Sequence, residues 1–121
     1  MKKFFAIWAF SLAACTAINY GNPPPADFPK LAIQEHPVKF GVFWDKCYPQ
    51  VSVFWKLMGA LPSACMTDDF SRGRCDIYYP EDERDDSVMA HERAHCRGYD
   101  HYGADDIAQG WEAYKAAHFI R

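Results

Sequence analysis

Apolar residues cluster in short segments along the chain, and their spacing predicts the elements of the fold. Residues 38–44 and 51–55 are rich in Val, Phe and Trp, which is typical of short strands, although the second segment could also begin a helix. Residues 75–79 form a third predicted strand, closed by Pro80. Residues 67–74 are polar and are expected to form a loop.

Two helices are predicted in the last third of the chain. Acidic residues crowd into residues 81–86, and negative charge stabilises a helix start, so a helix is expected to begin at residues 85–87. It should end at Gly98, which readily takes a left-handed conformation. Residues 104–119 carry apolar side chains at helical spacing, namely Ile107, Trp111 and Tyr114. They predict a second amphipathic helix packed on the first.

These elements predict a single small α+β domain, with short antiparallel strands packed on two helices. The chain has 121 residues, of which 50% are hydrophobic and 24% are charged, a composition typical of a packed globular domain. Its formal net charge of -3 argues against a general nucleic-acid binder, since no excess of Lys and Arg is available to neutralise phosphates.

The first residues are typical of an export signal. Lys2 and Lys3 precede an apolar run over residues 4–12, which is shorter than the roughly 20 residues of a membrane-spanning helix. Leu12-Ala13-Ala14-Cys15 resembles the lipobox of bacterial lipoproteins. That resemblance implies cleavage before Cys15, a lipid on Cys15 and, because Thr16 follows, the periplasmic side of the outer membrane. The alternative is an ordinary secretory signal cut nearby.

Three segments follow from this resemblance. Residues 1–14 would be the signal peptide, residues 15–30 the lipid anchor with a linker rich in proline, and residues 31–121 the folded domain. The proline run at residues 23–25 favours an extended conformation and is expected to act as a stalk.

Four cysteines remain after Cys15, and they are Cys47, Cys65, Cys75 and Cys96. An even number in an oxidising compartment predicts two disulfides. All three connectivities remain open, although Cys65 and Cys75 flank a short polar segment that could form a closed loop. No CxxC pair is present, which disfavours a zinc site built from cysteines.

Residues 91–101, HERAHCRGYDH, carry the candidate chemistry. On a helix, His91 and His95 lie one turn apart on one face, where both imidazoles can reach one cation. Gly98 lets the backbone turn, so His101 can supply a third nitrogen and leave a fourth position for water. Glu92 is then placed to act as the general base for that water.

The pattern HExxHxxGxxH in these residues resembles that of the metzincin zinc peptidases. The resemblance covers eleven residues and implies a zinc-dependent endopeptidase with His91, His95 and His101 as ligands. No methionine follows Met89, so the methionine-containing turn of metzincins has no counterpart downstream of the motif. An alternative third ligand is Glu112, by similarity to thermolysin-like peptidases, but Gly98 and His101 fit the metzincin arrangement directly.

Hydroxyl groups that could reach an oxyanion belong to Tyr99, Tyr102 and Tyr114, although packing is the favoured role for each. The expected partners are a peptide or protein substrate, which could pair with residues 75–79 as an edge strand, and a membrane through the lipid anchor. The alternative function is a non-catalytic, zinc-stabilised lipoprotein that assembles into a secretion or conjugation complex of the cell envelope.

Overall fold

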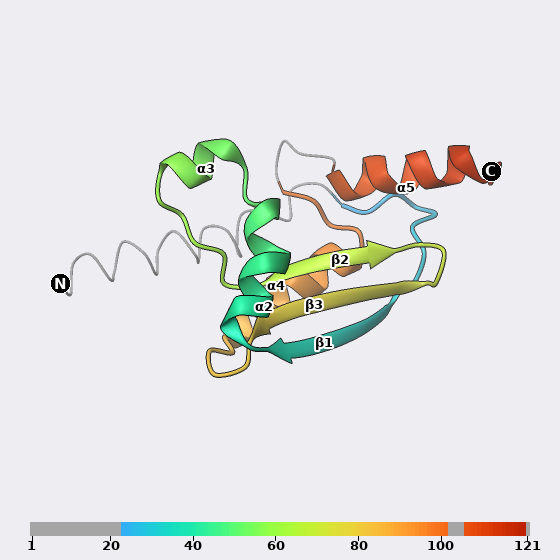
Figure 1. Ribbon diagram of the computed structural model, residues 1–121. Coiled ribbons are helices and arrows are strands. Elements are labelled where there is room, and N and C mark those ends of the chain that lie inside the picture. Colours follow the sequence, from blue (N-terminus) through green and yellow to red (C-terminus); the bar gives the residue numbers. More distant parts are fainter. Residues whose placement is uncertain (1–22, 102–105, 121) are drawn as a thin grey trace.

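The computed structural model describes residues 23–101 and 106–120. Along them the chain forms β1 (Ala32–Val38), α2 (Phe40–Cys47), the 3-10 turn η1 (Tyr48–Gln50), α3 (Val53–Leu57), β2 (Cys65–Asp69), β3 (Arg74–Pro80), α4 (Asp86–Cys96) and α5 (Asp106–Ala117). Figure 1 shows the strands as one sheet with α2 and α4 on opposite faces and α5 beyond the β2 side. The α+β class predicted from the sequence is confirmed.

The sheet has the strand order β1-β3-β2. β3 pairs antiparallel with β2 but parallel with β1, so the prediction of an antiparallel sheet is wrong for β1. The parallel pair arises because the chain crosses over through α2, α3 and β2 before it returns as β3. β3 is therefore central, and the prediction that residues 75–79 form an edge strand is wrong. β2 forms the edge of the sheet that faces α5 (Figure 1).

Residues 38–44 were expected to form a strand, but they end β1 and enter α2. The reason is the spacing of Phe43 and Cys47, which lie one turn apart on the buried face of α2 and are 2% and 0% exposed. They pack against Val38 and Tyr78 on one face of the sheet. Helical spacing therefore outweighs the strand preference of the aromatic residues.

Two further segments differ from the strand and loop expectations. The helix alternative is correct for residues 51–55, because Ser52 caps α3 by accepting a hydrogen bond from the amide of Trp55 at 3.4 Å. Residues 67–69, expected in a loop, belong to β2. The loop is limited to a tight turn in which the Asp69 carboxylate accepts hydrogen bonds from Ser71 and from the amide of Arg72.

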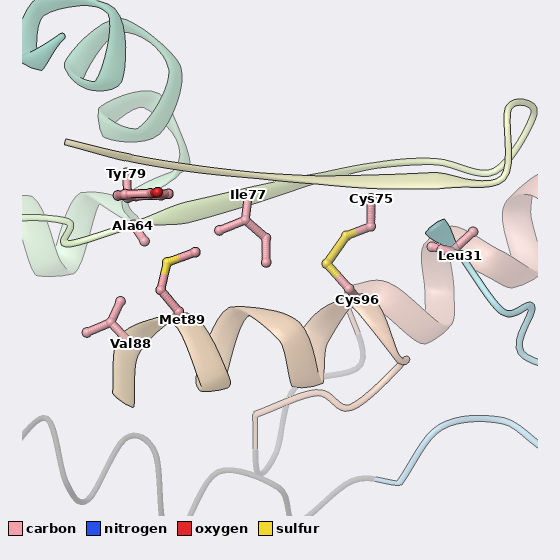
Figure 2. Packing of buried hydrophobic residues seen from close by; sticks show 8 residues of the cluster. All are labelled: Leu31, Ala64, Cys75, Ile77, Tyr79, Val88, Met89 and Cys96. Carbon is pink, nitrogen blue, oxygen red and sulfur yellow. A yellow bond between two sulfur atoms is a disulfide. The ribbon is translucent and has the colours of Figure 1, made fainter. Parts of the chain in front are cut away.

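The main core lies between β3 and α4. Ile77 and Met89 are 0% and 2% exposed and face each other across this layer (Figure 2). The disulfide between Cys75 and Cys96 ties the start of β3 to the last turn of α4. Since β3 is central and α4 carries the histidines, this bond fixes the helix on the most buried strand.

The second disulfide joins Cys47 at the end of α2 to Cys65 at the start of β2. The prediction of two disulfides is confirmed, whereas the closed loop between Cys65 and Cys75 is wrong. In the antiparallel register Cys65 pairs with Tyr78 and Cys75 pairs with Asp68, so the two cysteine side chains point to opposite faces of the sheet. Each therefore bonds to the helix that covers its own face.

α4 begins and ends as the sequence predicts. The Asp85 carboxylate accepts hydrogen bonds from the amides of Ser87 and Val88, and this cap opens the helix. Arg97 follows the last helical residue, and Gly98 then takes a left-handed conformation with a φ of +98°, which ends the helix.

The C-terminal helix is confirmed from Asp106 onward, while residues 104 and 105 lie outside the described residues. Its apolar face does not pack along α4 as expected. Trp111 instead contacts Phe70 in the β2–β3 turn and Phe28 before β1. Phe28 and Pro24 lie against Gly98, so this part of the expected linker packs on the domain.

Candidate metal centre

Three imidazole nitrogens meet at one point beside α4. The Nε2 atom of His91 lies 3.0 Å from that of His95 and 3.0 Å from that of His101. The third separation, between His95 and His101, is 3.1 Å. His91 and His95 come from adjacent turns of the helix, as the sequence predicts, and His101 returns to them after the chain has left the helix.

The end of α4 sets the path of the chain to His101. The amide of Tyr99 donates to the carbonyl of Ala94 at 3.1 Å, and the amide of Gly98 donates to the carbonyl of His95 at 2.9 Å. These two bonds around a residue of positive φ form a Schellman motif. The chain therefore reverses immediately after the helix, and His101 comes back beside the ring of His95.

The same turn also orients the ring of His95. The carbonyl oxygen of Tyr99 lies 2.7 Å from Nδ1 of His95. A carbonyl oxygen can only accept, so Nδ1 carries the proton and the Nε2 lone pair of the neutral ring points to the other two imidazoles. Hydrogen bonds of this kind are typical of histidines that bind metals.

The donor set fits a metal ion. A tetrahedral cation with metal–nitrogen distances of about 2.0–2.1 Å would hold its ligand nitrogens roughly 3.3 Å apart, within a few tenths of an ångström of the separations found here. Hydrogen bonds alone do not satisfy three nitrogens that face one point, because one proton serves only one pair at a time. The cluster of His91, His95 and His101 could therefore hold a metal ion.

Burial keeps the His91 imidazole neutral. His91 is 9% exposed, and burial, together with nearby His95 and His101, lowers its pKa from 6.5 to about 4. A neutral imidazole is the form that binds a metal. Burial has the opposite effect on Glu92, whose pKa is raised from 4.5 to about 8. A cation at the three nitrogens would lower that value again, because positive charge favours the carboxylate.

The histidines and Glu92 line one cleft of about 370 Å³. Met66 and Asp68 of the edge strand β2 contribute one part of its lining, and Val51 and Pro62, on either side of α3, contribute another. The site is therefore bordered by a strand that, within residues 23–101 and 106–120, pairs only with β3.

Asp100 is a site residue that the sequence reasoning missed. It is 4% exposed, lines the cleft and precedes His101. Its carboxylate accepts hydrogen bonds from the amides of Ile107 at 2.9 Å and Ala108 at 3.1 Å, so it caps the start of α5. An acidic residue next to a candidate ligand was the only sequence signal, since the carboxylate and the two amides are seven and eight positions apart in the chain.

Arg93 and Glu35 form a second contact that holds α4 in place. The guanidinium of Arg93 lies 3.2 Å from the carboxylate of Glu35 on β1, and Arg84 lies 2.9 Å from the same carboxylate. These arginines lower the pKa of Glu35, against the opposing effect of its partial burial. The ion pair with Glu35 orients the side chain of Arg93 toward the sheet.

The remaining predicted residues lie elsewhere. Glu112 is exposed and pairs with Lys115 at 2.9 Å, and Tyr114 stacks on Trp111 and His118. Neither residue lines the cleft, so the alternative ligand Glu112 is not brought to the histidines. Cys15 and Tyr102 lie outside the described residues.

Disulfides in both layers of the core are consistent with an oxidising, exported environment. Among residues 23–101 and 106–120, no helix is both long and apolar enough to cross a membrane. Comparisons with protein-family models, with curated proteins and with solved structures found no match to this chain.

Proposed function

We propose that this chain is an exported zinc metallopeptidase in which His91, His95 and His101 hold the metal and Glu92 is the general base. The observation that carries the proposal is the convergence of three Nε2 atoms within 3.1 Å of one another, in a cleft that Glu92 also lines. The HExxHxxGxxH pattern supports the same assignment by resemblance to metzincins.

The three imidazole ligands favour zinc over calcium and magnesium. Imidazole nitrogens suit zinc, whereas calcium and magnesium prefer oxygen ligands. A set of three protein ligands is typical of catalytic zinc sites, because a structural site usually has four. Zinc bound there would polarise a peptide carbonyl and lower the pKa of a water molecule to about 7.

Glu92 supplies the proton transfers of the proposed hydrolysis. Its carboxylate would accept a proton from the attacking water as the oxygen adds to the peptide carbonyl carbon. As the carbon–nitrogen bond breaks, the same group would donate that proton to the leaving amine. The position of Glu92 in the cleft supports this role, because burial raises its pKa to about 8 and a bound cation would lower that value toward neutral pH.

An extended peptide fits the cleft through β2. This strand is paired only on its β3 side among the described residues, so its other edge can form backbone hydrogen bonds with a substrate. Met66 and Asp68 alternate with Thr67 along the strand and line the cleft. β2 thus takes the substrate-pairing role that the sequence reasoning gave to residues 75–79.

The proposed cellular setting is the periplasmic side of the outer membrane, with a lipid on Cys15. The lipobox-like Leu12-Ala13-Ala14-Cys15 supports the anchor by resemblance, and the two disulfides support export. Mass spectrometry of the N-terminal peptide from cells would detect the lipid on Cys15. A free α-amino group at another residue would contradict it.

Cleavage of a mixed peptide library tests the peptidase directly. The purified protein should cleave peptides, lose activity with a chelator and regain it with zinc. Glu92→Gln should lower kcat by two or more orders of magnitude while zinc stays bound. Glu112→Gln is the matched control, because it removes an exposed carboxylate outside the cleft and should leave cleavage unchanged.

Glu92→Gln also distinguishes an enzyme from a zinc-stabilised assembly component of the envelope. If no peptide is cleaved by the zinc-loaded protein and Glu92→Gln supports normal growth and assembly in cells, the peptidase proposal is rejected. The histidines would then serve as a structural staple.

A further inference from the structure

α3 exposes an apolar surface that the proposed chemistry does not use. None of the five residues of this helix is buried. Six large apolar side chains in and after it are between 56% and 82% exposed, and they are Val53, Phe54, Trp55, Leu57, Met58 and Leu61. We call these six residues the α3 surface. Large exposed apolar side chains gathered in one short segment mark a candidate site of interaction.

The segment of chain that carries the α3 surface has lysines and no acidic residues. No Asp or Glu occurs between Lys46 and Thr67, and Lys56 lies within α3 itself. The ammonium group of Lys56 lies 4.5 Å from the centre of the Tyr48 ring, which places it beside η1. Lys46 lies in the last turn of α2, 4.5 Å from the ring of Tyr78 on β3. The α3 surface therefore combines aromatic and aliphatic side chains with Lys56, and the preceding helix carries a second cation, Lys46.

We propose that the α3 surface docks on a lipid bilayer that contains anionic headgroups. Trp55, Phe54 and Leu57 would enter the boundary between headgroups and acyl chains, where amphipathic aromatic and aliphatic side chains are stable. Lys46 and Lys56 would meet the negatively charged headgroups. A short exposed helix that carries a lysine fits an interfacial position and is too short to span the bilayer.

The length of the N-terminal chain favours a bilayer over a soluble protein as the occupant. Seven residues separate Cys15 from Pro23, where the described part begins. With a lipid on Cys15, this segment would reach at most about 30 Å. The domain would then stay close to the bilayer. In Figure 1 both segments lie above β2 in the view, α3 toward the start of β2 and the segment that follows Pro23 toward its end, near α5.

Docking would also place the cleft at the membrane. Val51 and Pro62 lie on either side of α3 in the sequence and line the cleft with the histidines. Substrates would then be peptide segments close to the bilayer surface, such as the juxtamembrane parts of membrane proteins. This consequence rests on the proposed function, whereas docking itself does not depend on peptidase activity.

Fluorescence of Trp55 tests the docking. The protein isolated from cells is added to vesicles of phosphatidylethanolamine and phosphatidylglycerol whose acyl chains carry bromine, which quenches tryptophan that enters the bilayer. We expect quenching relative to unbrominated vesicles, and Trp55→Phe should remove most of it. Trp111→Phe is the matched control, because Trp111 is 8% exposed and packs against Phe28 and Phe70.

A separate variant tests how much the lysines contribute to docking on the bilayer. Replacing both Lys46 and Lys56 with Glu should weaken partition of Trp55 into the bilayer on the order of tenfold or more. This readout reports the surroundings of Trp55 and not attachment, so it is informative with or without a lipid on Cys15.

Two results would overturn the proposal. One is emission from Trp55 that is the same with brominated and unbrominated vesicles. The other is a photoreactive group at Leu57 that yields a discrete protein adduct and no lipid adduct in native membranes, which would assign the α3 surface to a protein partner. Glu92→Gln leaves α3 untouched and should show normal quenching, so failure of the peptidase proposal is visible separately.

Discussion

His95 and Tyr99 are joined by a hydrogen bond in which Nδ1 of the ring donates to the backbone carbonyl at 2.7 Å. Through this bond, the backbone conformation at the end of α4 determines which nitrogen of His95 carries the proton. The Schellman motif after α4 places the carbonyl, the carbonyl fixes the proton on Nδ1, and Nε2 is left to face His91 and His101.

Gly98 is the residue on which this arrangement depends. Its φ is +98°, and an added Cβ would lie 2.7 Å from Cβ of Pro24 and 2.8 Å from Cγ of Phe28. Gly98→Ala should therefore lower the free energy of unfolding by roughly 2–4 kcal/mol, from left-handed strain and overpacking together. It should also weaken zinc binding. Chemical denaturation and metal titration measure the two effects.

Gly73→Ala is the control for Gly98→Ala. Gly73 also has a positive φ, of +65°, but an added Cβ there has no atom within 4 Å. The substitution should cost about 1–2 kcal/mol and leave zinc affinity unchanged. Equal losses of zinc affinity at both glycines would contradict the role assigned to the helix end.

The two disulfides are expected to differ in their effect on the metal site. Their sequence separations are 21 for Cys75–Cys96 and 18 for Cys47–Cys65, so removing either by double Ala substitution should cost a similar 2–4 kcal/mol of stability. Loss of Cys75–Cys96 should weaken zinc binding more, because it frees the turn of α4 that carries His95. A larger loss of affinity from the other pair would be inconsistent with this account.

Asp100 is predicted to fix the position of the neighbouring His101, because its carboxylate is hydrogen-bonded to the start of α5. Asp100→Ala removes acceptors for the amides of Ile107 and Ala108 and should lower stability by about 1–2 kcal/mol. Zinc affinity should fall as well, since Asp100 directly precedes His101 and would lose its hydrogen bonds to α5. Asp100→Asn retains one acceptor oxygen and should give an intermediate result in the same titration. Identical behaviour of the two variants would exclude a capping role.

Acid stability should depend on Asp76, which lies buried on the face of the sheet opposite α4. Its carboxylate accepts hydrogen bonds from Arg74 at 2.7 Å and His36 at 2.6 Å, and these bonds, with Arg74 the larger effect, lower its pKa below 3.8. A lowered carboxyl pKa stabilises the folded state above the unfolded value, and the contribution is lost as pH falls through the folded value.

Asp76→Asn should therefore flatten the decline of stability below about pH 4. Denaturation midpoints measured from pH 2 to pH 7 check this expectation. Asp45→Asn, at an exposed position of α2, is the control and should leave the slope as it is in the wild type.

The sequence predicts α4 well because three local signals agree. The acidic residues at 81–86, the spacing of His91 and His95, and Gly98 at the end all act within one or two turns of the helix. The candidate ligands could be named for the same reason. The convergence on His101 also followed from a local feature, the reversal at Gly98.

The sheet was harder to predict because its signals are not local. β1 contains Pro37 and alternates only weakly, and β2 has polar residues on both faces, so neither segment has a clear strand pattern. Their positions are fixed by pairing with β3 and by the Cys47–Cys65 bond. The cap from Asp100 to α5 was missed because the carboxylate and its partners are separated along the chain.

Metal content of the purified protein tests the central claim most directly. Elemental analysis should find about one zinc per chain in the wild type and in Glu92→Gln, and far less in His101→Ala, because two imidazoles alone bind zinc weakly. Wild-type protein that holds no stoichiometric metal after purification and zinc addition, or His101→Ala that retains zinc fully, would contradict a site built by His91, His95 and His101.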